Sequence, residues 1–340
     1  VNLIFNFLFT IVMLTDIEKE TNTDQIGVNN LYTPTLELIK GLYNLPFNDL
    51  VLKARLIHIE NFNPNSVQLS TLVNIKSGAC PEDCSYCPQS IRYKTDVSTT
   101  ALMSVEDILE KAKQAKQSGA SRFCMGAAWR SPKTKDLKQL LPVLKGIKEL
   151  GLETCMTLGM LTPSQASELK EAGLDYYNHN LDTSENFYSK IISTRTFDQR
   201  LDTIKNVQKS GMKVCCGGIL GLGESECDRF ELLHVLANME PQPESVPINT
   251  LVKVKGTPLQ DEKDVDPIDL VKLIATARIV MPKTYIRLSA GRSEMSDELQ
   301  ALCFFSGANS IFYGEELLTT ENPEINKDKL LMAKLGLTSE

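Results

Sequence analysis

The sequence predicts an α/β fold, a TIM-type (β/α)8 barrel with an N-terminal helical lead-in and a C-terminal extension. Two observations predict it. From residue 67 onwards, short runs rich in β-forming residues alternate with longer amphipathic runs of helical period. The chain has 340 residues, of which 42% are hydrophobic and 23% charged, so it can build the core of one large barrel.

The expected strands and helices alternate along the barrel region, and glycines stand where several helices should end. Strands are expected at residues 69–75, 121–124, 153–157, 176–180, 213–217, 245–251, 285–289 and 310–313. Helices are expected at residues 105–117, 135–150, 163–172, 197–210, 224–239, 267–279 and 296–305.

The lead-in before the barrel carries helical patterns at residues 33–42 and 48–61. Thr33 and Asn48 are suitable residue types to cap these helices at their N-termini. We expect the lead-in to cover one end of the barrel.

The chain divides into four expected segments: an apolar stretch at 1–14, the lead-in at 15–66, the barrel at 67–322 and a tail at 323–340. The apolar stretch is too short to cross a bilayer as a helix, and it lacks the basic start and cleavage site of a signal peptide. We therefore expect it not to be structural, with Met13 or a nearby residue as the natural start. A genuine interfacial anchor is the alternative.

Charge and cysteine content narrow the class of protein. The net charge is −7 and no basic run is present, so nucleic acid and acidic membrane surfaces are unsuitable partners. Nine cysteines at irregular spacing do not form the even-numbered framework of a secreted disulfide protein. A reducing, cytoplasmic location with metal-bound thiols fits better.

The stretch after the first expected strand carries three cysteines, Cys80, Cys84 and Cys87, at the spacing C-x3-C-x2-C. Three thiolates in a short loop are a soft ligand set for iron–sulfur or zinc. No fourth Cys or His follows nearby, since the next cysteine is Cys124. A three-ligand site leaves one coordination position open for a substrate, whereas closed structural zinc sites use four ligands. A zinc knuckle or a loop of unused thiols is the alternative.

The residues around these cysteines resemble those of a known family. Tyr86 before the last cysteine is similar to the signature of radical S-adenosylmethionine (SAM) enzymes, and residues 74–90, NIKSGACPEDCSYCPQS, resemble the biotin synthase family. The likeness extends over about residues 51–322. It implies a [4Fe–4S] cluster on Cys80, Cys84 and Cys87, with SAM on the open iron.

A second set of cysteines lies in the expected strands themselves. Cys124, Cys155 and Cys215 fall in three different strands, and Arg287 falls in a fourth. Each cysteine alone is more simply a small core residue, but an arginine is costly to bury without a partner. The residues therefore indicate a possible buried cluster with a cationic neighbour.

The resemblance makes this second site definite. It implies a [2Fe–2S] cluster held by Cys124, Cys155, Cys215 and Arg287, which serves as the sulfur source. Cys216 is the competing residue, but strand alternation puts neighbours on opposite faces, so only one of the two can face the lumen. We choose Cys215 as the cluster ligand because Val214-Cys215 matches the Val-Cys motif of the family.

Polar residues at the expected strand ends are candidates for ligand contacts. From the residues alone, positions 176–183 could equally form an Asx-rich turn, Arg200 a solvated helix charge, and the two threonines a helix cap. The resemblance implies SAM contacts at Tyr86, Met125, Gly126, Asn180, Asp182 and Arg200. It implies dethiobiotin contacts at Asn178, Asn180, Asn249, Thr319 and Thr320.

The activity that the resemblance implies is the last step of biotin biosynthesis, a radical SAM sulfurtransferase reaction. Two SAM molecules would be cleaved to methionine and 5′-deoxyadenosine while sulfur is inserted into dethiobiotin. A reducing electron-donor protein, flavodoxin-like or ferredoxin-like, and a homodimer are also implied. The rival interpretations are another radical SAM barrel, such as a mutase or a maturase, and an iron–sulfur electron carrier or zinc-binding structural protein.

Overall fold

The structure is a computed structural model of the chain, and it describes residues 33–314, 317–320 and 322–340. Pro34–Glu340 form one compact unit. The predictions for the apolar N-terminal segment and for the first part of the lead-in fall outside the described residues.

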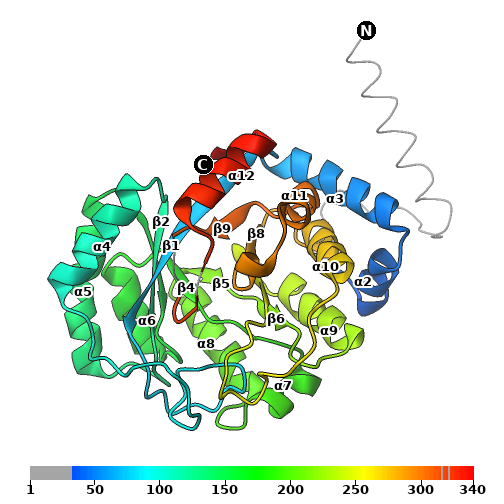
Figure 1. Cartoon of the computed structure of the whole chain (residues 1–340). Helices are drawn as coiled ribbons and strands as arrows, with labels where there is room; N and C mark the ends of the chain where they lie inside the picture. The colour runs from blue at the N-terminus through cyan, green and yellow to red at the C-terminus, as the bar shows by residue number, and fades with distance from the viewer. Residues whose placement is uncertain (1–32, 315–316, 321) are drawn as a thin grey trace. The chain divides into compact units, whose positions relative to one another are not determined.

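Parallel strands form a closed barrel at the centre of this unit (Figure 1). The strands are β1 (Ser66–Lys76), β2 (Arg122–Ala127), β3 (Glu153–Thr157), β4 (Tyr176–Asn178), β5 (Lys213–Cys215), β6 (Gly218–Leu220), β7 (Ser245–Thr250), β8 (Tyr285–Leu288), β9 (Ser310–Phe312) and β10 (Thr338–Ser339). The order is β1-β2-β3-β4-β5-β7-β8-β9, and β9 pairs with β1 to close the sheet. The predicted (β/α)8 barrel is confirmed, with β5 and β6 sharing one of the eight positions beside β7.

Helices connect successive strands and cover the outside of the barrel (Figure 1). They are α2 (Leu36–Tyr43), α3 (Phe47–Asn61), α4 (Val105–Gln117), α5 (Thr134–Glu149), α6 (Pro163–Glu171), α7 (Glu185–Ile191), α8 (Phe197–Lys209), α9 (Glu226–Ala237), α10 (Pro267–Val280), α11 (Asp297–Phe305) and α12 (Ile325–Leu335), with a 3-10 turn η1 (Arg292–Glu294). The main apolar core lies between these helices and the sheet.

The lead-in helices are present, but the predicted caps are wrong. Helix α2 is capped by Thr35, whose hydroxyl accepts a hydrogen bond from the Leu38 N–H at 3.2 Å, and not by Thr33. Helix α3 begins after Pro46 without a side-chain cap, so Asn48 lies inside its first turn. Proline is well suited to the start of a helix because its φ angle is already fixed near the helical value.

Two α-helices and two strands were not predicted, namely α7, α12, β6 and β10, and neither was the 3-10 turn η1. Helix α7 has only seven residues, too few for a periodic pattern. Strand β6 follows β5 after Gly217, where a Cβ atom would lie 2.0 Å from the carbonyl oxygen of Pro247, so only glycine lets the chain pass β7 here. In the predicted tail, α12 packs on the barrel unit and β10 pairs with the start of β1. The predicted boundaries at residues 66 and 322 stay predictions.

A second, smaller cluster lies on the face of the strands that points away from the main core. It contains Cys124, Cys155 and Tyr176, with Leu72 and Phe312 packed against them. Because neighbouring strand residues alternate between faces, this cluster belongs to the barrel lumen. The fold therefore brings two of the predicted cluster ligands together in the interior.

The C-terminal helix is fastened by a buried ion pair, which provides a test of the fold. Arg292 in η1 and Asp328 in α12 are about 1–2% exposed, and the Arg292 guanidinium donates two hydrogen bonds to the Asp328 carboxylate. Replacing Asp328 by alanine leaves a buried guanidinium unpaired, so we expect the free energy of unfolding to fall by about 3–5 kcal/mol. Urea unfolding followed by circular dichroism measures this loss.

The matched control is Lys334→Ala, which removes the exposed pair between Lys334 and Asp297. Water already solvates both partners of this surface pair, so its loss should move the urea midpoint very little. Equal midpoints for the two variants would contradict the proposed fastening of α12.

Candidate active site

One cavity of about 300 Å³ opens at the carboxyl ends of the barrel strands and reaches into the lumen. Its walls come from the segments that follow β1, β2, β3, β4, β7 and β8, and from a loop after β9. The predicted site residues that line it are Cys80, Cys84, Tyr86, Cys87, Cys124, Cys155, Asn178, Asn180, Asp182, Arg200, Asn249, Arg287, Thr319 and Thr320.

Three predicted site residues are not part of the cavity wall. Met125 is fully buried in the main apolar core, which leaves only its backbone for a ligand contact. Gly126 lies beneath Leu318, whose side chain would be 2.3 Å from a Cβ atom at this position. Cys215 is buried behind the wall, 1% exposed.

The cysteine loop after β1 is shaped by its backbone. The Cys80 N–H donates to the Gln89 carbonyl and the Ile91 N–H to the Cys80 carbonyl, both at 2.9 Å, so the loop closes on itself. Gly78 enters it with a φ of 65°. Within the described residues, no three His, Cys, Asp or Glu side chains converge as the ligands of one ion would. The three thiols line the cavity, and cysteine thiolates are the usual ligands of iron–sulfur clusters.

Burial sets the protonation of these thiols. It raises the pKa of Cys80 and Cys84, and it raises that of Cys87 to about 12, helped by the neighbouring thiols. The guanidinium groups of Arg195 and Arg200 oppose the shift at Cys84. Metal binding at this loop must therefore release protons, as is usual for thiolate sites.

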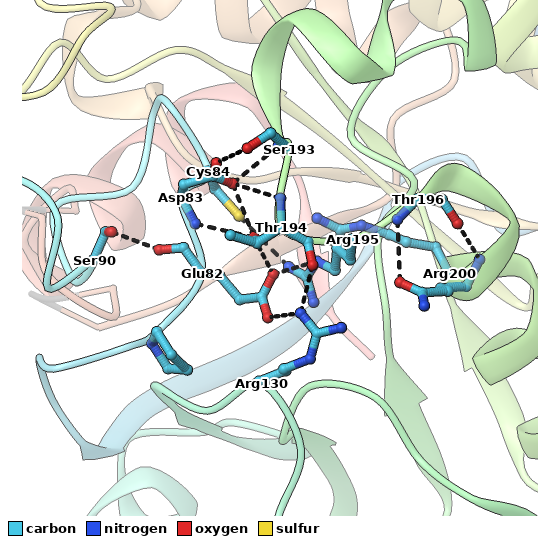
Figure 2. A network of polar contacts seen from close by, with 12 residues as sticks. Glu82, Asp83, Cys84, Ser90, Arg130, Ser193, Thr194, Arg195, Thr196 and Arg200 are labelled. Atoms are coloured by element: carbon cyan, nitrogen blue, oxygen red, sulfur yellow. Dashed lines mark hydrogen bonds and ion pairs between the residues drawn. The ribbon is translucent and has the colours of Figure 1, made fainter.

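A buried carboxylate fastens the cysteine loop to its neighbours (Figure 2). Glu82, 2% exposed, accepts from Arg130 Nη1 at 2.7 Å and from the Thr194 hydroxyl at 2.5 Å. The adjacent Asp83 accepts from the backbone N–H groups of Ser193 and Thr194 at 3.0 and 3.1 Å. The loops after β1 and β2 and the connection between α7 and α8 are thus tied together next to Cys84.

A second polar group contacts the loop through Tyr86. The Asp182 carboxylate accepts a hydrogen bond from the Tyr86 hydroxyl at 2.7 Å and pairs with Arg200. Arg200 also donates to the Asn180 carbonyl and to the Tyr188 hydroxyl, at 2.6 and 2.7 Å. Arg200 is 4% exposed, so its interpretation as a solvated helix charge is wrong.

The lumen holds the other set of thiols. Cys124 and Cys155 are directly opposite each other in the β2–β3 register. Burial opposes ionisation of Cys124, but the Cys155 thiol and the positive charges of Arg287 and Arg122 outweigh it, and the Cys124 pKa falls to about 7. Hydrogen bonding to Cys124 and burial raise the pKa of Cys155. One thiol of the pair is thus prepared to ionise.

Cys215 and Cys216 face different surroundings, as strand alternation predicts. Cys215 interacts with the charges of Arg287 and Cys124, which belong to the lumen, although burial still raises its pKa. Cys216 belongs to the main apolar core on the helix side, where burial raises its pKa strongly. Of the two, only Cys215 is near the other lumen thiols.

Arg287 is fully buried and has no carboxylate within 4 Å among the described residues. Its Nε donates to the Ser310 hydroxyl at 2.9 Å, and its Nη2 lies 3.1 Å from both Gln68 Oε1 and the Ser70 hydroxyl. The guanidinium carbon lies 4.7 Å from the centre of the Phe312 ring. Neutral partners hold the group without neutralising its charge, so the lumen is suited to an anion.

The predicted amide contacts are already ordered by the fold. Asn249 donates to the Gly218 carbonyl at 2.9 Å and accepts from the Ala290 N–H at 3.1 Å. Asn178 donates to the Thr157 hydroxyl at 3.0 Å. Each amide keeps a further donor or acceptor for a ligand, because a primary amide has two of each.

Two site residues were missed in the sequence. Glu82 and Arg195 both line the cavity, and both are at least nine-tenths buried. Each stands in a loop, where no periodic pattern separates a buried charge from a solvated one. Only the position of Glu82 between two cysteines could have indicated it.

In the part of the chain that the structure describes, no helix has the length and apolar character needed to cross a bilayer.

Comparisons with known proteins identify the family. The model of the Radical SAM superfamily matches residues 74–236, and that of the Biotin and Thiamin Synthesis associated domain matches residues 247–338. The biotin synthase of Hahella chejuensis (strain KCTC 2396) is 60% identical over 306 residues, which are 90% of this chain and 86% of the relative. The chain belongs to the biotin synthase family. The biotin synthase of Legionella pneumophila (strain Corby) is 62% identical over 300 residues, 88% of this chain and 95% of the relative.

Solved structures support the same fold. A methylornithine synthase superposes with a TM-score of 0.76 at 20% identity, covering 91% of this chain and 95% of that one. An FeFe-hydrogenase maturase from Carboxydothermus hydrogenoformans superposes with a TM-score of 0.77 at 16% identity, covering 90% and 76%. These likenesses concern the barrel alone.

The predicted family, the biotin synthase function and the radical SAM sulfurtransferase class are confirmed. The family carries a [4Fe–4S] cluster and SAM, as the Radical SAM model implies. The rival interpretations, a different radical SAM barrel and an electron carrier or zinc protein, do not agree with 60% identity to a biotin synthase.

The exposure of the nine free cysteines predicts their order of chemical modification in the reduced, metal-free biotin synthase. We expect iodoacetamide to modify the exposed Cys227 first and the half-buried Cys80 and Cys87 next. Mass spectrometry of quenched samples measures this order. The cysteines that should stay unmodified until urea is added are Cys84, Cys124, Cys155, Cys215, Cys216 and Cys303. Rapid labelling of Cys124 or Cys215 would contradict the burial of these two thiols.

Proposed function

We propose that this biotin synthase binds dethiobiotin in its cavity between two iron–sulfur clusters, one held by the cysteine loop and one by the lumen thiols. The single observation that carries the proposal is that the three loop thiols and two of the lumen thiols, Cys124 and Cys155, line one cavity whose wall also carries amides and hydroxyls. A substrate in this cavity can touch both ends.

The residues of the cysteine loop fit a [4Fe–4S] cluster with SAM. Cys80, Cys84 and Cys87 supply three soft ligands, and the next cysteine in the sequence is Cys124, which supports a cluster with one open iron. When bound, the cluster supplies the electron that cleaves SAM into methionine and a 5′-deoxyadenosyl radical. We assign the SAM contacts to Tyr86, the backbone of Met125 and Gly126, Asn180, Asp182 and Arg200.

The lumen residues fit a [2Fe–2S] cluster. Cys124, Cys155 and Cys215 provide thiolates, and the unneutralised guanidinium of Arg287 provides a positive neighbour for an anionic group. When bound, this cluster supplies the sulfur that enters the product. The buried ligands also keep water from this end of the cavity.

The amides between the two ends suit the ureido ring of dethiobiotin, since a urea and a primary amide each offer donors and acceptors. We assign this ring to Asn178, Asn180 and Asn249, and the carboxylate tail to Thr319 and Thr320, which line the same cavity. The carbons that receive sulfur carry unactivated C–H bonds. A general base has no acidic proton to remove there, which supports radical chemistry.

The partners of the enzyme follow from its chemistry. The reaction needs an external electron, for which a flavodoxin-like or ferredoxin-like donor is proposed, and the family resemblance supports a homodimer. Nine cysteines as free thiols support a reducing, cytoplasmic location.

The proposed activity predicts products that can be counted. After anaerobic reconstitution with iron and sulfide, the chain should form biotin from dethiobiotin, with two 5′-deoxyadenosine molecules for each biotin. Liquid chromatography with mass spectrometry measures both. Deoxyadenosine without biotin would contradict the proposed sulfur transfer.

The choice between adjacent cysteines gives a matched pair of variants. Cys215→Ser should keep the [4Fe–4S] absorption and SAM cleavage but lose the [2Fe–2S] absorption and biotin formation. Cys216→Ser, on the opposite face, should keep both clusters. Anaerobic absorption spectra with iron and sulfide analysis report the result, and the reverse pattern would refute the choice of Cys215.

A further inference from the structure

The side chain of Arg195 bridges the carboxylate of Glu82 and the thiol of Cys84 (Figure 2). Its Nη2 lies 3.5 Å from Cys84 Sγ, within hydrogen-bond distance of a sulfur acceptor, and its Nε lies 3.5 Å from Glu82 Oε2. The Arg195 side chain is 9% exposed and lines the cavity. A guanidinium can only donate, so the sulfur is the acceptor.

Glu82 holds this arginine in place but does not cancel the local positive charge. The same carboxylate also pairs with Arg130 at 2.7 Å, so two guanidinium groups share one negative charge. The Asp83 carboxylate is turned to Ser193 and Thr194 and pairs with no arginine. One positive charge therefore remains beside Cys84.

The charge of Arg200, in contrast, is neutralised. Its guanidinium is neutralised by Asp182, and its remaining bonds go to Tyr188 and the Asn180 carbonyl. It makes no contact with a cysteine sulfur in the hydrogen bonds of the described residues. Arg195 is the arginine that reaches the cluster loop's sulfur.

We propose that Arg195 is a positioning residue that donates a hydrogen bond to the Cys84 sulfur of the cluster and raises the reduction potential of that cluster. The proposal rests on the proposed function, in which Cys84 is a cluster ligand. Hydrogen bonds to cluster sulfurs and nearby positive charge favour the reduced, more negative state, and burial strengthens both effects. Easier reduction at this end of the cavity would assist delivery of the electron that SAM cleavage needs.

The test compares Arg195→Gln with Arg130→Gln, a control that removes the other guanidinium on Glu82 and leaves Cys84 untouched. Both variants and the unaltered chain are reconstituted anaerobically, and iron and sulfide are counted before any titration. The electron paramagnetic resonance signal of the reduced [4Fe–4S] cluster is then followed against applied potential. We expect Arg195→Gln to lower the ratio of reduced to oxidised cluster about tenfold at a fixed potential, which is 59 mV for one electron. Arg130→Gln should lower the ratio clearly less, because it removes a charge near Glu82 but leaves the hydrogen bond from Arg195 to Cys84 in place.

Arg195→Lys keeps the charge but loses the planar fork, and it should recover part of the shift. If Arg195→Gln does not retain its cluster, the reduction potential of Arg195→Lys provides the test instead. A reduction potential in the Arg195 variants equal to that of the unaltered chain would overturn the inference. A shift in Arg130→Gln as large as that in Arg195→Gln would also overturn it, because the network would then only fasten the loop. Absence of the cluster from the unaltered chain would instead overturn the proposed function.

Discussion

Closure of the sheet between β9 and β1 is the constraint on which the site depends. The β1–β9 pairing leaves no free edge and encloses a lumen. Arg287 spans this seam, because its hydrogen bonds reach Ser310 of β9 and Gln68 and Ser70 of β1. The same closure encloses Cys124 of β2 and Cys155 of β3 in a shared interior. A buried cation and buried thiols can therefore face one group.

The two ends of the cavity use the same physical arrangement. At each end an arginine contacts or polarises a cysteine sulfur, Arg195 at Cys84 and Arg287 at Cys124. At the loop, carboxylates hold the arginines and tie three loops together. In the lumen, only neutral groups hold Arg287, so its charge is left for a ligand. The difference suits a loop assembled from segments outside the strands and a lumen fixed by the strands themselves.

Much of the fold and of the candidate site could be predicted from the sequence, because these features depend on periodicity and on local motifs. Strand β3 and helix α4 were predicted to the residue, and the opposite faces of Cys215 and Cys216 follow from strand alternation. Burial of charges such as Arg195 in a loop and Arg200 in α8 could not be predicted, because it is decided by contacts distant in sequence. Arg195 meets Glu82 across more than a hundred residues, and Arg200 is buried by Asp182 and not solvated. The caps failed for a similar reason, since Thr35 and Thr33 differ only in the path of the backbone.

The most direct test of the central claim is an anaerobic crystal structure of the reconstituted enzyme with SAM and dethiobiotin bound. Our account predicts one cluster on Cys80, Cys84 and Cys87, a second on Cys124, Cys155, Cys215 and Arg287, and dethiobiotin between them. Dethiobiotin bound outside this cavity, or a lumen whose thiols hold no cluster, would contradict it.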